Sequence, residues 1–308
     1  MCIRDRYRSI LYTSVVLVHD HDSNEAVMEI LVNPNYAKGL AIIVTNDYAT
    51  RTVCGATAYS HLSGTVVDGQ RLKDAFEALD FTVRWKRNVR EEDLQLLMSE
   101  IRGLRYDLAM HYKCIVFVFS GHGETADKLV MQDGKKIDIC DHFIAPVLPG
   151  EAPLIGSIPK VFIIDACRGV DKTETVCVPA NYAIANVKGN TVGPDTCDSQ
   201  VRKGSHDIPM LSLPKKGNFL VAYSTLPGCI ANDYKGIRKG SLWLEVLAKH
   251  LPVNRGSIED VLTDANEELH NLCRRENFEF QQPVKVACLN RRLHLLDSHD
   301  CVGMATFE

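Results

Sequence analysis

Short apolar runs alternate along the first half of the chain with stretches in which apolar residues recur every three or four positions. The runs are rich in β-branched and aromatic residues, as in strands buried on both faces, and they cover residues 39–46, 81–86, 114–119 and 160–164. Helical spacing marks residues 67–79 and 91–110, and a short helix is expected near 139–147. This alternation predicts an α/β fold built on a largely parallel sheet.

The pattern then breaks and resumes. Residues 170–216 hold seven Gly and Pro residues and show no periodicity, which is typical of a functional loop or a cleavable linker. Beyond it, we expect a strand at 219–223, helices at 241–250 and 258–273, and terminal strands at 284–289 and 293–296. The sequence therefore predicts two ordered segments separated by the stretch 170–216.

Composition removes several classes of function. The 308 residues carry 35 basic against 39 acidic side chains, a net charge of −4, which gives no footprint for nucleic acid and no polybasic membrane patch. No apolar run approaches the roughly 18 to 20 residues that span a bilayer. The eleven cysteines show no C-x-x-C pair, so we expect scattered reduced thiols in a cytoplasmic protein and no structural zinc site.

The N-terminal residues have two interpretations. Residues 1–6 resemble a translated sequencing-adapter scar. If they are native, three arginines precede the apolar run 10–18 and weakly mimic a secretion signal. Thr13 and Ser14 interrupt that run, however, and no small-residue cleavage site follows it. We therefore favour a cytoplasmic protein.

Two potentially reactive residues follow two of the expected strands. His122 comes shortly after the strand at 114–119, and Cys167 shortly after the strand at 160–164. The carboxyl ends of parallel strands meet at one edge of a sheet, where an imidazole beside a thiol forms an activated nucleophile. Each residue alone is more often a loop histidine or a packed cysteine, but the pair at two strand ends points to catalysis. The amides of Gly123 and Cys167 are candidates for holding an oxyanion.

The sequence around these residues resembles that of the caspases, a family of cysteine peptidases, from about residue 37 to residue 297. Residues 120–123 (SGHG) are similar to the family's histidine motif, and residues 163–169 (IIDACRG) to its cysteine motif. Further similar segments follow in the family's order, at 38–43, 63–72, 219–228, 240–241 and 282–283. The resemblance implies a cysteine endopeptidase with Cys167 as nucleophile and His122 as general acid and base. It also implies a three-layer sandwich in which helices flank a mostly parallel six-stranded sheet.

The same resemblance implies a division of the chain and a way of working. Residues 1–36 would be an N-terminal segment too short for a recruitment domain, 37–169 a large catalytic subunit, 170–216 a linker, 217–297 a small subunit, and 298–308 a tail. A zymogen would be cleaved in the linker, and pairs of subunits would form a homodimer. The expected substrates are proteins, in a pathway linked to programmed cell death, with no metal or organic cofactor and no nucleic acid or membrane partner.

The expected specificity pocket departs from the family pattern. Caspases hold a substrate aspartate with basic side chains, but the matching places here are Leu62, Asp165 and Asp233. Metacaspases and paracaspases, which cut after Arg or Lys, carry an acidic residue where Asp165 lies. A substrate carboxylate about 4 Å from Asp165 would meet about 4 kcal/mol of repulsion, roughly a thousandfold in preference. We therefore favour a basic residue before the cleaved bond, although Asp165 could instead be neutralised by a buried partner.

Four further residues bear on this pocket. Asp68 matches an acidic residue of the metacaspases but also a structural aspartate of the caspases, and Ser224 is assigned to the pocket by the resemblance. If the enzyme is instead Asp-specific, His61 or Arg238 would supply the positive charge.

A catalytically silent homologue that acts by dimerising with a partner is the third alternative, which the intact Cys167 and His122 argue against. A phosphate-binding loop at 120–123 is a weak fourth, since the segment lacks both phosphate-loop spacings.

Overall fold

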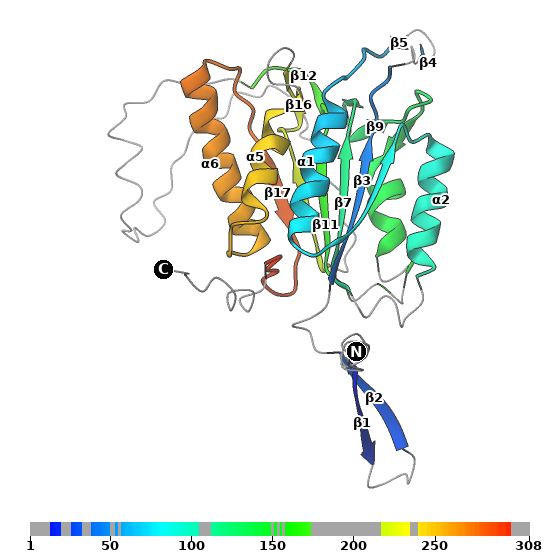
Figure 1. Cartoon of the computed structure of the whole chain (residues 1–308). Coiled ribbons are helices and arrows are strands. Elements are labelled where there is room, and N and C mark those ends of the chain that lie inside the picture. The colour runs from blue at the N-terminus through cyan, green and yellow to red at the C-terminus, as the bar shows by residue number, and fades with distance from the viewer. Residues whose placement is uncertain are drawn as a thin grey trace, which may run out of the picture.

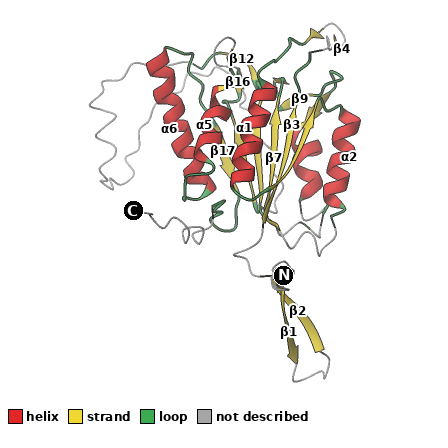
Figure 2. Ribbon diagram, viewed as in Figure 1, coloured by secondary structure: helices red, strands yellow, loops and turns green. Residues whose placement is uncertain are grey.

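A six-stranded sheet forms the centre of the molecule (Figures 1 and 2). The computed structural model describes residues 13–19, 26–32, 38–49, 53–54, 57–104, 112–148, 151–152, 155, 158–173, 217–234 and 240–296. The sheet contains, in chain order, β3 (Lys38–Thr45), β6 (Thr82–Arg87), β7 (Tyr112–Ser120), β11 (Lys160–Asp165), β13 (Phe219–Tyr223) and β17 (Val284–Ala287). Their order in space is β17-β13-β11-β7-β3-β6. Each of these strands lies within two residues of a strand predicted from the apolar runs.

The register of the sheet aligns the ends of its central strands. All neighbouring strands are parallel except β17, which runs antiparallel to β13. Ser120 at the end of β7 pairs with Thr45 at the end of β3 and with Asp165 at the end of β11. Three carboxyl ends therefore lie level at one edge, where a parallel sheet presents its site.

Helices cover both faces of the sheet and complete three layers (Figure 2). On one face, α1 (Thr65–Ala78), α5 (Leu242–His250) and α6 (Ile258–Glu276) pack against alternate strand residues such as Ile43 and Val118. On the other face, α2 (Glu91–Arg102) packs against the intervening residues, such as Ile42 and Phe117. This arrangement confirms the predicted α/β sandwich.

Three predicted elements are corrected. The helix predicted for 91–110 ends at Arg102, because Gly103 closes it and glycine is a poor helix former. The helix near 139–147 is a π-helical turn at Cys140–Ile144 followed by a 3₁₀ turn at Ala145–Val147. Residues 293–296 form no strand beyond one bridge between His294 and Ser257. Leu293 and Leu295 are buried as irregular chain against the helices.

Several small strand pairs were not predicted, most of them because segments of two or three residues carry no readable period. A three-stranded antiparallel sheet contains β8 (Gly123–Glu124), β9 (Lys128–Val130) and β10 (Lys136–Asp138). Four pairs join β1 (Thr13–His19) to β2 (Ala26–Val32), β4 (Val53–Cys54) to β5 (Thr57–Ala58), β12 (Gly169–Asp171) to β14 (Gly228–Cys229), and β15 (Asp233–Tyr234) to β16 (Gly240–Ser241).

Parts of the predicted division lie outside the described residues. These are most of the N-terminal segment, all but the first four residues of the predicted linker, the end of the predicted small subunit with the tail from residue 297 on, and Arg238. The boundaries at 36, 169, 216 and 297 thus stay predictions. None of the helices in the described ranges is long and apolar enough to cross a membrane.

Candidate active site

His122 and Cys167 stand at matching places beyond two neighbouring strands. Ser120 and Asp165 are paired across β7 and β11, and each candidate residue follows its strand end by two positions. Both line one pocket of about 90 Å³. The other residues around it are Leu62, Thr65, Asp68, Ser120, Gly121, Asp165, Ala166, Ala231, Asn232 and Ser241. The pocket thus draws on both predicted subunits.

The ring of His122 is held from several sides. Its Nε2 lies 2.8 Å from the carbonyl oxygen of Ser60. Because a carbonyl only accepts, Nε2 carries the proton, and in the neutral ring Nδ1 keeps the lone pair. The rings of Tyr48 and Tyr59 lie 4.7 and 5.4 Å from the imidazole, centroid to centroid. An imidazole with its lone pair on one known nitrogen is a defined proton acceptor.

Tyr48 also fixes the backbone at His122. Its hydroxyl accepts from the His122 amide at 3.1 Å and donates to the Val130 carbonyl at 2.5 Å. Burial raises the pKa of this hydroxyl despite the hydrogen bond from His122, so it remains protonated. The buried ring thus ties the turn after β7 to β9.

The thiol of Cys167 contacts the main chain of Ala231, between β14 and β15. The Ala231 amide donates to Sγ at 3.3 Å, and Sγ lies 3.6 Å from the Ala231 carbonyl oxygen, which accepts from the thiol. Burial raises the pKa of the Cys167 thiol; the Ala231 amide lowers it, while the negative charge of Asp165 raises it further. These effects favour the protonated thiol over the thiolate at neutral pH.

Gly123 lies directly against the backbone of the candidate nucleophile. A Cβ added at Gly123 would stand 2.2 Å from the carbonyl oxygen of Cys167 and 2.9 Å from the Cβ of Ala166. Only glycine allows the two strand ends to approach this closely. The role of the Gly123 and Cys167 amides as an oxyanion hole stays a prediction.

Three of the five residues predicted for the specificity pocket, Asp165, Asp68 and Leu62, line the pocket that also holds His122 and Cys167. Asp165 is 8% exposed and Asp68 1% exposed. Among the described residues that line this pocket, none is Lys or Arg. Its charged lining is therefore acidic.

Asp68 is engaged in holding the fold together. Its Oδ2 accepts from the amide of Ser241 at 2.9 Å, and its Oδ1 lies 3.5 Å from Nη1 of Arg71. Gly240, at φ +101°, approaches so closely that a Cβ there would meet Asp68 Oδ1 at 2.3 Å. Asp68 thus clamps α1 to β16, and β16 pairs with the strand that follows Ala231.

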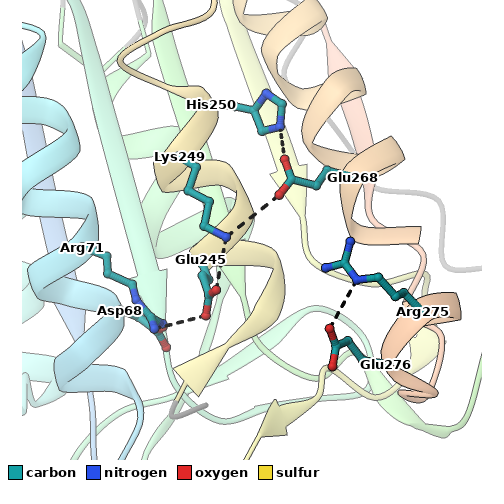
Figure 3. Close-up of polar contacts among 8 residues, drawn as sticks. All are labelled: Asp68, Arg71, Glu245, Lys249, His250, Glu268, Arg275 and Glu276. Atoms are coloured by element: carbon teal, nitrogen blue, oxygen red, sulfur yellow. Dashed lines mark hydrogen bonds and ion pairs between the residues drawn. The ribbon is translucent and has the colours of Figure 1, made fainter. Parts of the chain in front are cut away.

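An ion-pair network extends from this carboxylate across the helices (Figure 3). Arg71 also contacts Glu245 at 3.1 Å, and Glu245 lies 3.3 Å from Lys249. Lys249 and His250 both face Glu268 on α6, at 3.9 and 2.7 Å. The charge of Asp68 is therefore shared with Arg71.

The remaining predicted pocket residues lie elsewhere or are only partly described. Ser224 directly follows β13 and is fully buried. Its amide donates to the carbonyl of Ile164 in the neighbouring strand β11, and it does not line the pocket. Asp233 belongs to β15, opposite Ser241 on β16, but its side chain is outside the description. His61 is exposed and is not part of the pocket wall.

Other features were not found from the sequence. Tyr48, Tyr59, Ser60 and Ala231 contact the candidate pair, and no sequence pattern pointed to them. A larger cavity of about 310 Å³ lies between the end of β6 and α2, but it holds neither His nor Cys. Among the described residues, no group of three or more His, Cys, Asp or Glu could hold a metal ion.

Comparison with known proteins places these features in one family. A sequence profile described as the caspase domain matches residues 38–294. Human caspase-10 is 24% identical over 71% of this chain and 36% of its own length, and Drosophila melanogaster caspase-1 is 26% identical over 73% and 60%. The chain therefore spans less than two thirds of either relative.

Two further relatives match over more of their length. Mouse caspase-3 is 26% identical over 75% of this chain and 72% of its own. The crystal structure of caspase-1 from Spodoptera frugiperda superposes with a TM-score of 0.64 at 19% identity, over 86% of this chain and 94% of that one. At that identity, the superposition supports the fold.

Proposed function

The chain belongs to the caspase domain family, and we propose that it is a cysteine endopeptidase in which Cys167 is the nucleophile and His122 the general acid and base. One observation carries the proposal: the two side chains follow aligned strand ends and line one pocket, with the Ser60 carbonyl fixing the proton on Nε2 of His122.

The geometry supports a two-step acyl transfer. Substrate displaces the Ala231 contact, and Nδ1 of His122 accepts the thiol proton as Sγ attacks the peptide carbonyl carbon. The amides of Gly123 and Cys167 stabilise the resulting oxyanion. Collapse breaks the C–N bond, and His122 protonates the leaving amine. A water molecule, deprotonated by His122, then hydrolyses the thioester and restores the thiol.

We further propose that the residue before the cleaved bond is Arg or Lys. The acidic lining of the pocket supports this preference, because a buried carboxylate favours a guanidinium or ammonium and repels a carboxylate. The alternative is cleavage after Asp. It would need a positive charge from Arg238, since His61 is exposed outside the pocket wall.

Fluorogenic peptides that differ only in the residue before the cleaved bond test both points. Wild-type protein should cleave the Arg and Lys peptides, with kcat/KM about a thousandfold above that for the Asp peptide. Cys167→Ala should cleave none, while Cys229→Ala, a neighbouring cysteine outside the pocket lining, should remain active. Activity that survives in Cys167→Ala would overturn the proposed nucleophile.

A second variant separates specificity from catalysis. Asp165→Gln removes one of the two pocket carboxylates and leaves His122 and Cys167 in place, so the preference for Arg over Asp should fall at least tenfold. An unchanged ratio would show that Asp165 does not set the specificity. Cleavage after Asp by the wild type would support the Asp-specific alternative.

The wider role follows from family membership. We propose that the enzyme acts on proteins in the cytoplasm in programmed cell death, after cleavage within residues 170–216, and as a homodimer of large and small subunits. A protein that cleaves none of the peptides yet activates a caspase on mixing would instead support the silent homologue.

A further inference from the structure

Two consecutive residues outside the pocket lining hold the imidazole of His122. Ser60 places its carbonyl oxygen 2.8 Å from Nε2, and Tyr59 places its ring 5.4 Å from the imidazole, tilted by 38°. Tyr59 directly precedes Ser60 in the sequence, whereas the pocket residues Leu62 and Thr65 follow it. Tyr59 itself does not line the pocket. Any displacement of Tyr59 therefore moves the carbonyl that fixes the proton on His122.

Tyr59 is fastened to the strand that begins just after His122. Its hydroxyl donates to Oε1 of Glu124 in β8 at 2.6 Å, and Oε2 of Glu124 lies 2.8 Å from Nζ of Lys136 in β10. Burial raises the pKa of the Glu124 carboxyl, but the hydrogen bonds from Lys136 and Tyr59 leave it below its usual value. Glu124 is thus a charged acceptor at neutral pH, which strengthens the bond from Tyr59.

We propose that Tyr59 is a positioning residue for the general base, anchored through Glu124 and Lys136. The inference rests on the proposed function, since it concerns how His122 acts in that reaction. The terminal torsion of a histidine side chain is soft, so the ring needs contacts on its faces and at one nitrogen to keep the other nitrogen directed at the thiol. Tyr59 supplies the face contact and sets the position of the neighbouring Ser60 carbonyl.

The first experiment compares kcat and KM for Tyr59→Leu, Tyr59→Phe and Lys136→Gln. Tyr59→Leu loses both the ring and the anchor, and its kcat should fall by about 10- to 100-fold, the range for a misplaced catalytic group. KM should change by less than about twofold, because Tyr59 lies outside the pocket lining. Tyr59→Phe and Lys136→Gln keep the ring, so each should lose only about threefold in kcat.

Lys128→Gln is the matched control for Lys136→Gln. Lys128 lies on the neighbouring strand β9 of the same small sheet and pairs with Asp138 at 2.9 Å, without reaching Tyr59. Its kcat should stay at the wild-type value. An equal loss in both lysine variants would show that the small sheet is merely destabilised and would overturn the inference.

The second experiment needs no peptide cleavage. The ¹⁵N chemical shifts of the imidazole, assigned with His122→Asn, report which ring nitrogen carries the proton above the histidine titration. The wild type should show the proton on Nε2, and Tyr59→Leu a mixture of both tautomers. An unchanged tautomer or an unchanged kcat in Tyr59→Leu overturns the inference. A wild type that shows the tautomer shift but cleaves nothing would overturn the proposed function alone.

Discussion

At the scale of single residues, Gly123 is tightly constrained beside the proposed nucleophile. In Gly123→Ala, the new Cβ would overlap the Cys167 carbonyl, so one of the two strand ends must move. We expect a loss of about 1–3 kcal/mol in the free energy of unfolding, measured in urea, and loss of peptide cleavage. Gly103→Ala is the control, since its nearest neighbour would be 3.4 Å away. A fully active Gly123→Ala would contradict the close approach.

Because of Lys160, the free energy of unfolding should change with pH in the alkaline range. It is fully buried at the start of β11, its Nζ donates to the Ile155 carbonyl, and burial lowers its pKa to about 8. An unfolded lysine titrates near pH 10.4, so between about pH 8 and 10.4 the unfolded chain binds more protons than the folded one. The free energy of unfolding should therefore gain on the order of 3 kcal/mol from this group as pH rises through that range.

The comparison with Lys160→Met isolates this contribution, because cysteines and tyrosines titrate in the same range in both proteins. The free energy of unfolding should be measured in urea from about pH 7.5 to 10. As pH rises, the value for the wild type should increase relative to that for Lys160→Met. Parallel curves would mean that Lys160 titrates alike in the folded and unfolded chains.

The sequence could identify the reactive side chains of the site but not the groups that hold them. His122 and Cys167 are recognisable because their own side chains would carry the chemistry. Ser60 and Ala231 act through their main chains, which every residue possesses, and they lie 62 and 64 positions from their partners. Tyr59 acts through a ring contact that only the folded chain creates. No local pattern could have revealed these contacts.

At the scale of elements, Arg168 joins the ends of three strands around the site. Its Nε and Nη2 donate to the two carboxylate oxygens of Asp127, between β8 and β9, at 2.6 and 3.1 Å. Its Nη1 donates to the Thr225 carbonyl after β13, and its guanidinium lies 3.8 Å from the ring centroid of Tyr223. The residue after Cys167 thus fixes the end of β11 to the end of β13 and to the turn between β8 and β9.

Arg168→Met should be strongly destabilising, because it leaves Asp127 buried without this partner. The expected loss is about 3–5 kcal/mol in the free energy of unfolding. The double variant Arg168→Met with Asp127→Leu should recover part of it, so the two single losses should exceed the double loss. Lys172→Met, which breaks an exposed ion pair with Glu279, should cost less than about 1 kcal/mol. Additive losses at 127 and 168 would contradict the coupling.

Elements were predictable where burial imposed a pattern. β11 and β13 are buried along their whole length, so their apolar runs marked them almost to the residue. The segment 293–296 carries three leucines yet is irregular, because the helices bury Leu293 and Leu295 without strand pairing. α2 was drawn too long because apolar residues continue past Gly103. For residues 293–296, burial was predicted correctly and the backbone conformation was not.

At the scale of the whole molecule, one sheet runs across the predicted linker. β11 precedes the linker and β13 follows it, yet they pair in parallel from Lys160 opposite Phe219 to Ile164 opposite Tyr223. The helices α5 and α6 pack on the same apolar face as α1. The two parts therefore share one core.

A cut in the linker should leave these parts associated. With a site for an unrelated protease inserted within residues 174–216 of Cys167→Ala, digestion of the folded protein should yield two fragments that elute together in size-exclusion chromatography. Fragments that separate without denaturant would contradict a shared core.

The pairing of β11 with β13 also favours folding of the intact chain before the linker is cut. While the chain is intact, closing the segment between these strands costs about 3–4 kcal/mol of entropy, because that cost grows only with the logarithm of length. A tether of this kind acts like an effective concentration on the order of millimolar. Two halves synthesised separately at micromolar levels would meet about a thousand times less often. Continuity of the chain thus speeds assembly, while the finished sheet no longer depends on it.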